Sequence, residues 1–387
     1  MERRVLMCRT HPVLEFDYDI DSGQAVGTGV VLDERRLPRE LVDHGKIAVY
    51  AGRINAWWRS RAIPPTRDRI REVLEVTGAS STVDLLNRSL GLSLSDQFWV
   101  KPQDSDASWE DQNFFDNTFD ERFGELLLTT YSSSHEFSFD VPDSSTGGDL
   151  PKRWIINENG KRILVKGGRT GQEPINEVIA TKLCERLGIK AVHYSLGAEQ
   201  NRFVSLCDEM LKDDEELVSA WQLLGSVKQA HGVSAEQQWL QIAEAFGANA
   251  DAIRAATDDW LLVDFLMRNT DRHYNNFGVI RNVETFEVRP APLFDTGASL
   301  WAGEIEVDNR DYKTKPFFSS PKRPSARRQL ELVSDWNHYD LDRLTDWPEE
   351  VTTQLTRTRL LPDAKINDIG KALEGRVSIV SWVKSHH

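Results

Sequence analysis

The sequence predicts an α+β protein of two lobes, with a β-rich amino-terminal part and an α-helical carboxyl-terminal part. Alternating strand patterns occur around residues 13–18 and 26–32. Two further strand-like runs flank Glu158-Asn159-Gly160, and an Asn-Gly pair between such runs predicts a tight hairpin. After about residue 208 the pattern becomes predominantly helical. These three observations set the fold class.

Length and composition limit the class of protein. At 387 residues, with 40% apolar and 28% charged residues, the chain can bury more than one core. Its net charge of −14 repels phosphate backbones and anionic lipids, so we expect no direct nucleic-acid binding and no membrane association. The three cysteines form no paired motif, and no apolar run approaches the ~18 residues of a membrane span. A cytoplasmic location is the resulting prediction.

The order of elements predicts where the chain divides. A helix begins near Pro174 and ends at Gly188, because apolar residues recur on one face between a typical starting residue and a typical stop. Strand-like segments follow at 191–196 and 203–207, before an acidic break. We therefore predict an α+β module over residues 1–80, a β-rich small lobe over 81–209 and a helical large lobe over 210–387.

The segment richest in chemistry follows an apolar helical run, Trp260 to Met267, that only Asp264 interrupts. The run leads into Asn269-Thr270-Asp271-Arg272-His273-Tyr274-Asn275-Asn276, and strand-like residues 277–280 come next. A second strand, predicted over 286–294, ends at Asp295. If the two strands pair as a hairpin, Asn276 and Asp295 lie at the same open end.

Asp271, Asn276 and Asp295 form a set of oxygen-bearing side chains that suits phosphoryl transfer. An amide and a carboxylate suit Mg²⁺ bridging the phosphates of ATP, and a second carboxylate can accept the proton of the attacking hydroxyl. The step from Asp271 to Asn276 also equals the Asp-to-Asn step of kinase catalytic loops. The alternative is a polar loop whose Asp and Asn residues only cap and turn, but the ordered set favours a site.

The same residues resemble a known family. Asn269 to His273 with Asn276-Phe277, followed by Leu293-Phe294-Asp295-Thr296-Gly297, resembles the catalytic loop and metal-binding turn of the HipA-like kinases. The resemblance implies a two-lobed, protein-kinase-like fold with Asp271 as catalytic base and Asn276 and Asp295 as Mg²⁺ ligands. It gives His273 a phosphate-side or orienting role.

The chain also departs from the broader kinase pattern. It has no G-x-G-x-x-G motif, and Thr270 precedes the catalytic aspartate where eukaryotic kinases have arginine. Thr296 stands in place of the phenylalanine of D-F-G. These departures fit the HipA-like branch better than the eukaryotic one. They are also compatible with a descendant that has lost kinase activity.

Lys166 is the candidate cation on the ATP side. It ends an apolar strand, so its stem can pack while its ammonium reaches the α- and β-phosphates. Its candidate acidic partner is Glu177, eleven residues on in the predicted helix, with Glu173 as the rival. A lysine that simply extends to water at a strand end is the alternative.

Two further segments complete the predicted ATP site. By the resemblance, Gly148 with Pro151-Lys152 occupies the place of the phosphate-side loop, and the adjacent Gly147 is a further candidate for ATP binding. Ser145 matches the family's autophosphorylated serine, with Ser144 and Thr146 as neighbouring alternatives. Residues 203–210 have the form of a strand leading into a hinge between lobes, where the main chain of Cys207 or Glu209 would bind adenine.

The predicted function is that of an ATP- and Mg²⁺-dependent serine/threonine protein kinase acting on a Ser or Thr hydroxyl of a protein. The resemblance implies a toxin-antitoxin role with a DNA-binding antitoxin as partner. Two alternatives stay open. One is a nucleotide-binding pseudokinase acting as a regulatory or DNA-associated partner, and the other is a kinase of small molecules or lipid head groups.

Overall fold

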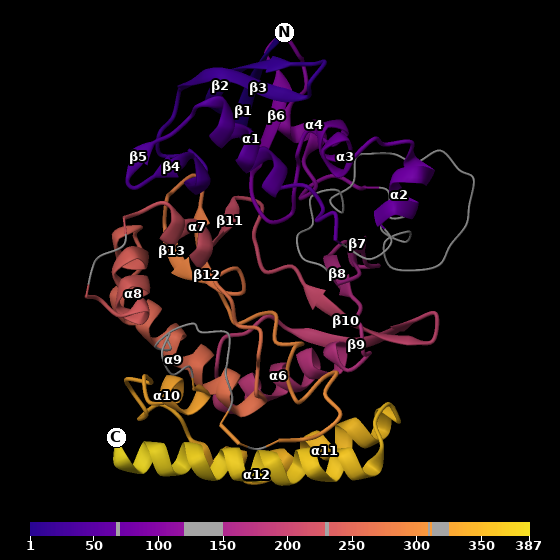
Figure 1. The fold of residues 1–387 in the computed structure, drawn as a ribbon, viewed down its shortest axis with the longest axis vertical. Helices are drawn as coiled ribbons and strands as arrows, with labels where there is room; N and C mark the ends of the chain where they lie inside the picture. The colour runs from indigo at the N-terminus through magenta and orange to yellow at the C-terminus, as the bar shows by residue number, and fades with distance from the viewer. Residues whose placement is uncertain (67–69, 120–149, 229–231, 309, 312–324) are drawn as a thin grey trace. The chain divides into compact units, whose positions relative to one another are not determined.

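The computed structural model describes the chain except for residues 67–69, 120–149, 229–231, 309 and 312–324 (Figure 1). It divides into two compact units, and each unit gathers segments that are distant in the sequence. Unit 1 comprises Met1–Val165, Leu211–Gln229 and Ile280–Val288, and unit 2 comprises Lys166–Met210, Ala230–Val279 and Arg289–His387. The division at residues 80 and 209 that the sequence suggests stays a prediction.

A four-stranded antiparallel sheet with the order β3-β2-β1-β6 forms the first part of unit 1. The two strands predicted near the amino terminus are present as β2 and β3, joined by a turn at Gly23. The elements of this part are β1 (Glu2–Cys8), β2 (His11–Asp19), β3 (Gln24–Val31), η1 (Arg39–Leu41), β4 (Val42–Asp43), β5 (Lys46–Ile47), α1 (Ala51–Ser60), α2 (Ile70–Thr77), α3 (Thr82–Arg88), β6 (Phe98–Pro102) and α4 (Trp109–Gln112).

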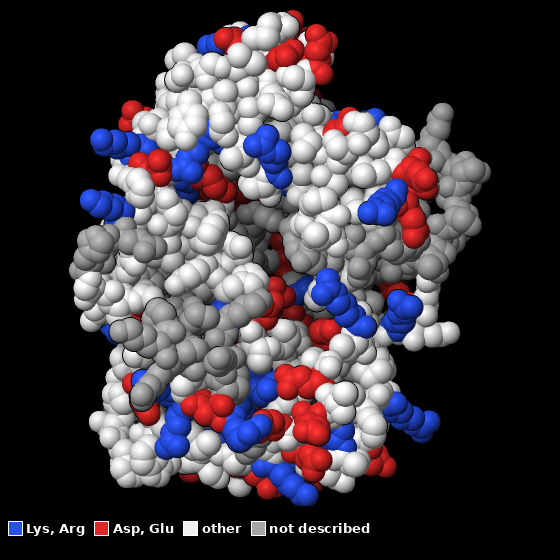
Figure 2. All heavy atoms as spheres, viewed as in Figure 1, with Lys and Arg blue, Asp and Glu red and all other residues white. Residues whose placement is uncertain are grey.

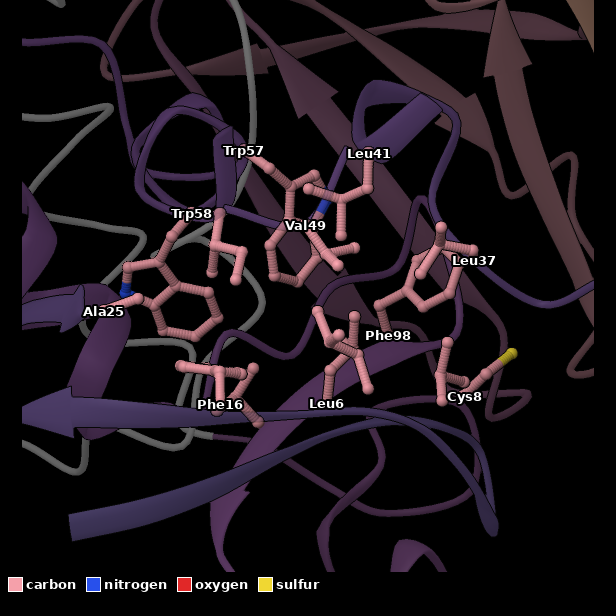
Figure 3. Close-up of a cluster of buried hydrophobic side chains, with 14 of the residues drawn as sticks. Leu6, Cys8, Phe16, Ala25, Leu37, Leu41, Val49, Trp57, Trp58 and Phe98 are labelled. Atoms are coloured by element: carbon pink, nitrogen blue, oxygen red, sulfur yellow. The ribbon is translucent and has the colours of Figure 1, made fainter. Parts of the chain in front are cut away.

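The inner face of this sheet packs against helix α1 (Figure 3). Leu6 and Phe16 point from the sheet toward Trp57 and Trp58 of α1, and all four side chains are buried. Alternate residues of a strand face one side, so the period-2 pattern of the sequence is what builds this core. The core gives unit 1 its own hydrophobic centre.

The hairpin predicted at Asn159-Gly160 is confirmed by strands β7 (Lys152–Ile156) and β8 (Arg162–Lys166). The Asn157 amide donates to the Lys161 carbonyl at 2.9 Å, and Gly160 has φ +74°, a left-handed conformation that glycine adopts without strain. Lys166 is therefore the last residue of its strand, as the sequence predicts.

Two later segments of the chain complete unit 1. They contain β11 (Glu215–Ser219), α7 (Ala220–Gly225) and most of β12 (Gly278–Asn282). The Arg281 guanidinium donates to the buried Glu216 carboxylate at 2.6 Å, which ties β12 to β11. Burial, assisted by the charges of Asp96 and Glu40, raises the pKa of Glu216, and the neighbouring arginine only partly offsets this effect.

Unit 2 is mainly helical, as the sequence predicts for the carboxyl-terminal part. Helix α6 (Glu173–Leu187) has Pro174 in its first turn and ends at Gly188 with φ +72°, which confirms both predicted ends. Helix α9 (Ala250–Met267) packs against α6, α8 and α12 (Figure 1). The other elements are β9 (Tyr194–Glu199), β10 (Arg202–Asp208), α8 (Ala235–Ala245), α10 (Ala326–Leu330), η3 (Leu341–Leu344), α11 (Trp347–Thr358) and α12 (Asp363–His386).

Strand β13 (Val288–Pro290) is shorter than the predicted strand over 286–294. Phe286 has φ +63°, outside the extended region, so the strand cannot begin there. Beyond the strand, Leu293 bridges to Ala191, and its amide donates to the Lys190 carbonyl at 2.9 Å. The segment that carries Asp295 is thus fixed within unit 2 by residues just after α6.

Surface charges are mixed on the face shown in Figure 2, where Lys and Arg side chains lie among Asp and Glu side chains. Ion pairs of unit 2 such as Arg186 with Asp346 and Glu350 have this interspersed character. In the part of the chain that the structure describes, no helix is both long enough and apolar enough to span a lipid bilayer.

Candidate active site

The predicted catalytic loop begins where helix α9 ends. Arg268 takes a left-handed conformation with φ +54° and terminates the helix. The Asn269 side chain then donates to the Asp264 carboxylate at 2.8 Å and accepts the Asp271 amide at 3.0 Å. The last turn of α9 thereby fixes the backbone of the loop just before Asp271.

Within the loop, Asp271 and Asn276 are brought together. The side-chain nitrogen of Asn276 donates to the Asp271 carbonyl at 2.9 Å, which closes the five-residue step that the sequence shows. The Asp271 side chain is 37% exposed, so it is accessible to a substrate. The His273 ring lies 4.0 Å from the Asp271 carboxylate, beyond hydrogen-bond distance.

Buried aromatic rings anchor the far end of the loop. Phe277, which follows Asn276, packs its ring 5.1 Å from Trp239 and 5.2 Å from Trp260, measured between ring centroids. The edge-to-face geometry with Trp239 is a favourable arrangement of aromatic pairs. Because Phe277 is held in the core, the backbone position of the neighbouring Asn276 is restrained.

Lys166 lies between two carboxylates. Its ammonium nitrogen is 2.7 Å from Glu177 Oε1 and 2.7 Å from Asp295 Oδ1. Burial on its own lowers the pKa of Lys166, but the charges of Asp295 and Glu177 outweigh burial and hold the pKa well above its usual value. Lys166 is therefore a fixed positive charge next to the Asp295 turn. Its partner on helix α6 is Glu177, whereas Glu173 accepts hydrogen bonds from Thr170.

The turn at Asp295 has an unusual backbone. Asp295 has φ +58°, in the left-handed region that only short polar residues and glycine visit readily. The side chain is 40% exposed although one oxygen contacts Lys166. A non-glycine residue in this region is uncommon, and such residues cluster at functional sites.

Helix α6 forms hydrogen bonds with the residues that follow Asp295. The amide and hydroxyl of Thr296 both donate to Glu177 Oε2, at 2.9 and 2.7 Å. The Asn176 side chain donates to the carbonyls of Gly297 and Ser299 at 2.8 and 2.7 Å. Gly297 permits this approach, because a Cβ there would lie 3.2 Å from the Cβ of Glu173. The helix and the turn form one continuous hydrogen-bonded assembly.

Arg272 joins the loop to the segment that leads to Asp295. Its guanidinium pairs with both oxygens of Asp264, at 2.8 and 2.9 Å, and is 2% exposed. One nitrogen, Nη1, also donates to the Phe294 carbonyl at 2.8 Å and to the carbonyl of Asn276. The two halves of the predicted site are therefore linked through this side chain.

The donor atoms fit a hard cation. The side-chain nitrogen of Asn276 is engaged by the Asp271 carbonyl, so the oxygen is the atom that its amide can offer to a metal. No group of three or more His, Cys, Asp or Glu side chains in the described chain could hold a metal alone. One carboxylate, one amide and the phosphates of a nucleotide make up a set that Mg²⁺ commonly uses.

Other predicted residues lie apart from this arrangement or outside the description. Ser145, Gly147 and Gly148 lie outside the described residues, together with their neighbours Ser144 and Thr146. Cys207 is opposite Tyr194 in the β9–β10 ladder, and burial raises the pKa of its thiol to about 12. Glu209 is half-buried after the end of β10. An adenine-binding role for the Cys207 or Glu209 main chain stays a prediction.

Sequence reasoning missed the residues that organise the site, namely Arg272, Asp264, Asn176 and Thr296. A signal existed for the first two. Asp264 is the one charge within an apolar helical run, and an arginine follows eight residues later beside the predicted base. A buried charge requires a partner, so this pair could have been expected. The local sequence marks Thr296 only as a departure from the D-F-G motif, and nothing in it marks Asn176.

A protein family and a known protein match parts of this chain. The model of the HipA-like C-terminal domain family matches residues 144–351, more than half of the chain. The serine/threonine-protein kinase CtkA of Helicobacter pylori is 25% identical over 136 residues, which are 34% of this chain and 42% of that protein. The chain thus matches less than half the length of that relative. At the level of the family, these matches support a function like that of serine/threonine kinases.

One solved structure shares the fold over almost the whole chain. A chain from the Shewanella oneidensis MR-1 complex of HipA, HipB and operator DNA, a toxin-antitoxin system, aligns with a TM-score of 0.58 and 15% identity over 99% of both chains. The crystal structure of the Helicobacter pylori proinflammatory kinase CtkA aligns with a TM-score of 0.48 and 17% identity, over 60% of this chain and 94% of that one. The fold is α+β and kinase-like, and the chain belongs to the HipA-like C-terminal domain family.

Proposed function

We propose that this chain is an ATP- and Mg²⁺-dependent serine/threonine protein kinase. One observation carries the proposal: the Lys166 ammonium is held between Glu177 and Asp295, at a turn that Arg272 links to the Asp271–Asn276 loop. A fixed cation, a carboxylate and an amide oxygen around one turn, with a second exposed carboxylate nearby in the loop, are the groups that phosphoryl transfer requires.

Each residue has a role in this proposal. Lys166 would contact phosphate oxygens, with Glu177 fixing its position, and Asn276 and Asp295 would hold Mg²⁺. When bound, ATP supplies the γ-phosphoryl group, and Mg²⁺ offsets the charge of the phosphates. Asp271 orients the acceptor hydroxyl and takes its proton as the phosphoryl group is transferred. His273, 4.0 Å from Asp271, would orient the loop or the phosphates.

Autophosphorylation on Ser145 is part of the proposal. The support is that the family match includes the loop containing Ser144, Ser145 and Thr146. A phosphate adds a charge of about −2 near the phosphate-side loop and would lower ATP affinity. Mass spectrometry after incubation with ATP should place the phosphate on Ser145, and Ser145→Ala should lack it. Phosphate on Ser144 or Thr146 instead would reassign the site within the same loop.

A DNA-binding antitoxin is the partner that we propose. The support is the shared fold over 99% of a chain from a complex whose other members are an antitoxin and operator DNA. The net charge of −14 favours contact with DNA through such a partner over direct contact. Titration calorimetry with a purified HipB-like protein tests the idea, and the absence of binding at micromolar concentration would exclude that partner.

Incubation with radiolabelled ATP and Mg²⁺ tests the enzyme assignment. Label should appear on the chain itself or on a serine/threonine protein substrate, and Asp271→Asn should lower the rate by about 10²-fold or more. The matched control is Asp259→Asn, an aspartate of helix α9 that lies outside the loop. Nucleotide binding without transfer would identify a pseudokinase, and label only on small molecules or lipid head groups would identify a different acceptor class.

A further inference from the structure

Arg272 occupies an unusual position for a side chain that only stabilises a fold. It follows the predicted base directly, yet its guanidinium points into the interior and is 2% exposed. There it pairs with both oxygens of Asp264 at 2.8 and 2.9 Å. A buried ion pair of this kind gives little net stability, because desolvation of the charges offsets most of their attraction. Stability alone therefore does not account for it.

The remaining contacts of Arg272 suggest what the pair does. Its Nη1 atom donates to the carbonyl of Asn276 and, at 2.8 Å, to the carbonyl of Phe294. Asn276 is one predicted metal ligand, and Phe294 directly precedes the other, Asp295. A single nitrogen thus contacts the backbone of both ligand-bearing segments, which are separated by almost twenty residues in the sequence.

The planar guanidinium of Arg272 fixes the distance between the two backbone segments that it contacts. The guanidinium is rigid, and Asp264 holds it from the opposite side with two hydrogen bonds. Asp264 also accepts a bond from Asn269, whose side chain in turn accepts the Asp271 amide. The Asp264 carboxylate, near the end of helix α9, is therefore linked through Asn269 to the backbone of Asp271. It is linked through Arg272 to the backbones of both ligand segments.

We infer that Arg272 is a positioning residue that sets the distance between Asn276 and Asp295 and thereby determines affinity for the divalent cation. This inference rests on the proposed function, because it takes those two side chains as metal ligands. Groups that orient metal ligands from behind typically contribute tenfold to hundredfold in metal affinity. Lysine cannot replace arginine in this role, because its point charge cannot bind a carboxylate with two parallel bonds while reaching two carbonyls.

The test compares Arg272→Lys with Arg268→Lys. Arg268 is a matched control, because it lies four residues earlier, is 7% exposed and pairs with both oxygens of Glu304. The measurement is Mn²⁺ binding in the presence of a non-hydrolysable ATP analogue, followed by electron paramagnetic resonance. Nucleotide affinity without metal is measured in parallel by calorimetry.

We expect Arg272→Lys to raise the Kd for Mn²⁺ by about tenfold or more, with nucleotide affinity in the absence of metal changed less than about threefold. Arg268→Lys should change neither value by more than about twofold. If Arg272→Lys fails to fold, Asp264→Glu keeps the charge and displaces the guanidinium, and should raise the Kd by about threefold. Unchanged Mn²⁺ affinity in the folded variant, or equal weakening by Arg268→Lys, would overturn the inference.

Failure of the proposed function gives a different result. A wild-type chain that binds no Mn²⁺ with nucleotide would remove both the function and this role of Arg272. A wild-type chain that binds Mn²⁺ with nucleotide but transfers no phosphate would remove the kinase assignment alone. In that case the comparison of Arg272→Lys with Arg268→Lys still decides the positioning role.

Discussion

The hydroxyl of Thr296 donates a hydrogen bond of 2.7 Å to the carboxylate of Glu177, and the Thr296 amide donates to the same oxygen at 2.9 Å. The other oxygen of Glu177 accepts the bond from Lys166. The residue after the predicted metal ligand Asp295 thus holds the partner of the predicted phosphate-binding lysine. A threonine in place of the phenylalanine of the D-F-G motif is therefore a connecting element of the site.

Replacing Thr296 tests this connection. Thr296→Val keeps the shape and removes the hydroxyl, and a hydrogen bond to a charged group contributes about 1.5–3 kcal/mol. If that bond is needed to hold Glu177 in the reacting complex, kcat should fall by about tenfold or more, while Thr296→Ser should stay within about threefold of wild type. The rate of label transfer from ATP measures both. Equal rates for the valine and serine variants would show that the hydroxyl does not act through Glu177.

The two glutamates of helix α6 make a second comparison. Glu177→Gln removes the charge that fixes Lys166, and we expect transfer to fall by about 10²-fold. Glu173→Gln should change the rate less than about threefold, because Glu173 bonds to Thr170 and not to the lysine. Steady-state kinetics with varied ATP separate an effect on binding from one on turnover. A larger loss of transfer from Glu173→Gln than from Glu177→Gln would show that Glu173, and not Glu177, is the partner of Lys166.

Asn176 should stabilise the turn as a donor. Its side-chain nitrogen donates to the carbonyls of Gly297 and Ser299, so Asn176→Asp would place a carboxylate against two carbonyl oxygens. We expect the free energy of unfolding to fall by about 2–4 kcal/mol, more than for Asn176→Ala. Urea denaturation followed by circular dichroism measures the change. Asn337→Ala, at an exposed position of the same unit, is the control and should cost less than about 0.5 kcal/mol.

Asp259 predicts a pH dependence of stability. Burial raises the pKa of this carboxyl to about 6, even though the Tyr339 hydroxyl donates to it at 2.8 Å. Between the ordinary pKa of about 4 and the raised pKa of about 6, the folded state binds more protons than the unfolded state. The contribution of Asp259 to stability is therefore greatest at low pH and is lost as the pH rises through about 6.

The variant Asp259→Asn removes this titration. At each pH we compare the free energy of unfolding of the variant with that of wild type. This difference should favour the variant by about 2 kcal/mol more at pH ~7.5 than at pH ~4. Asparagine can still accept the Tyr339 hydroxyl, so the hydrogen bond is preserved. Urea unfolding at both pH values gives the two differences. Identical differences at both pH values would mean that the carboxyl titrates normally.

Local patterns in the sequence predicted the local structure well. The Asn159-Gly160 hairpin and the helix between Pro174 and Gly188 are encoded by residues close together in the chain, and both are confirmed. Both ends of the last predicted strand were wrong, because Phe286 adopts a positive φ and Leu293 bridges to Ala191. Strand length depends on such tertiary partners more than on β-propensity.

Contacts across long stretches of sequence were harder to predict. Lys166 and Asp295 are 129 residues apart, and Thr296 lies 119 residues from Glu177. Spacing alone could not choose between Glu173 and Glu177, because the two lie one turn apart on the same face of α6 and the choice depends on which turn lies beside the lysine. The motif residues were nevertheless identifiable, since Asp271 and Asn276 are joined by a short loop whose step is visible in the sequence.

The central claim is that Asn276 and Asp295 hold a divalent cation against the phosphates of ATP. A crystal structure of the chain with a non-hydrolysable ATP analogue and Mn²⁺ tests it most directly, because anomalous diffraction locates the metal. The account predicts a metal peak bonded to the side-chain oxygen of Asn276 and to the Asp295 carboxylate, with Lys166 contacting the phosphates. Bound nucleotide with the metal away from both side chains would contradict it.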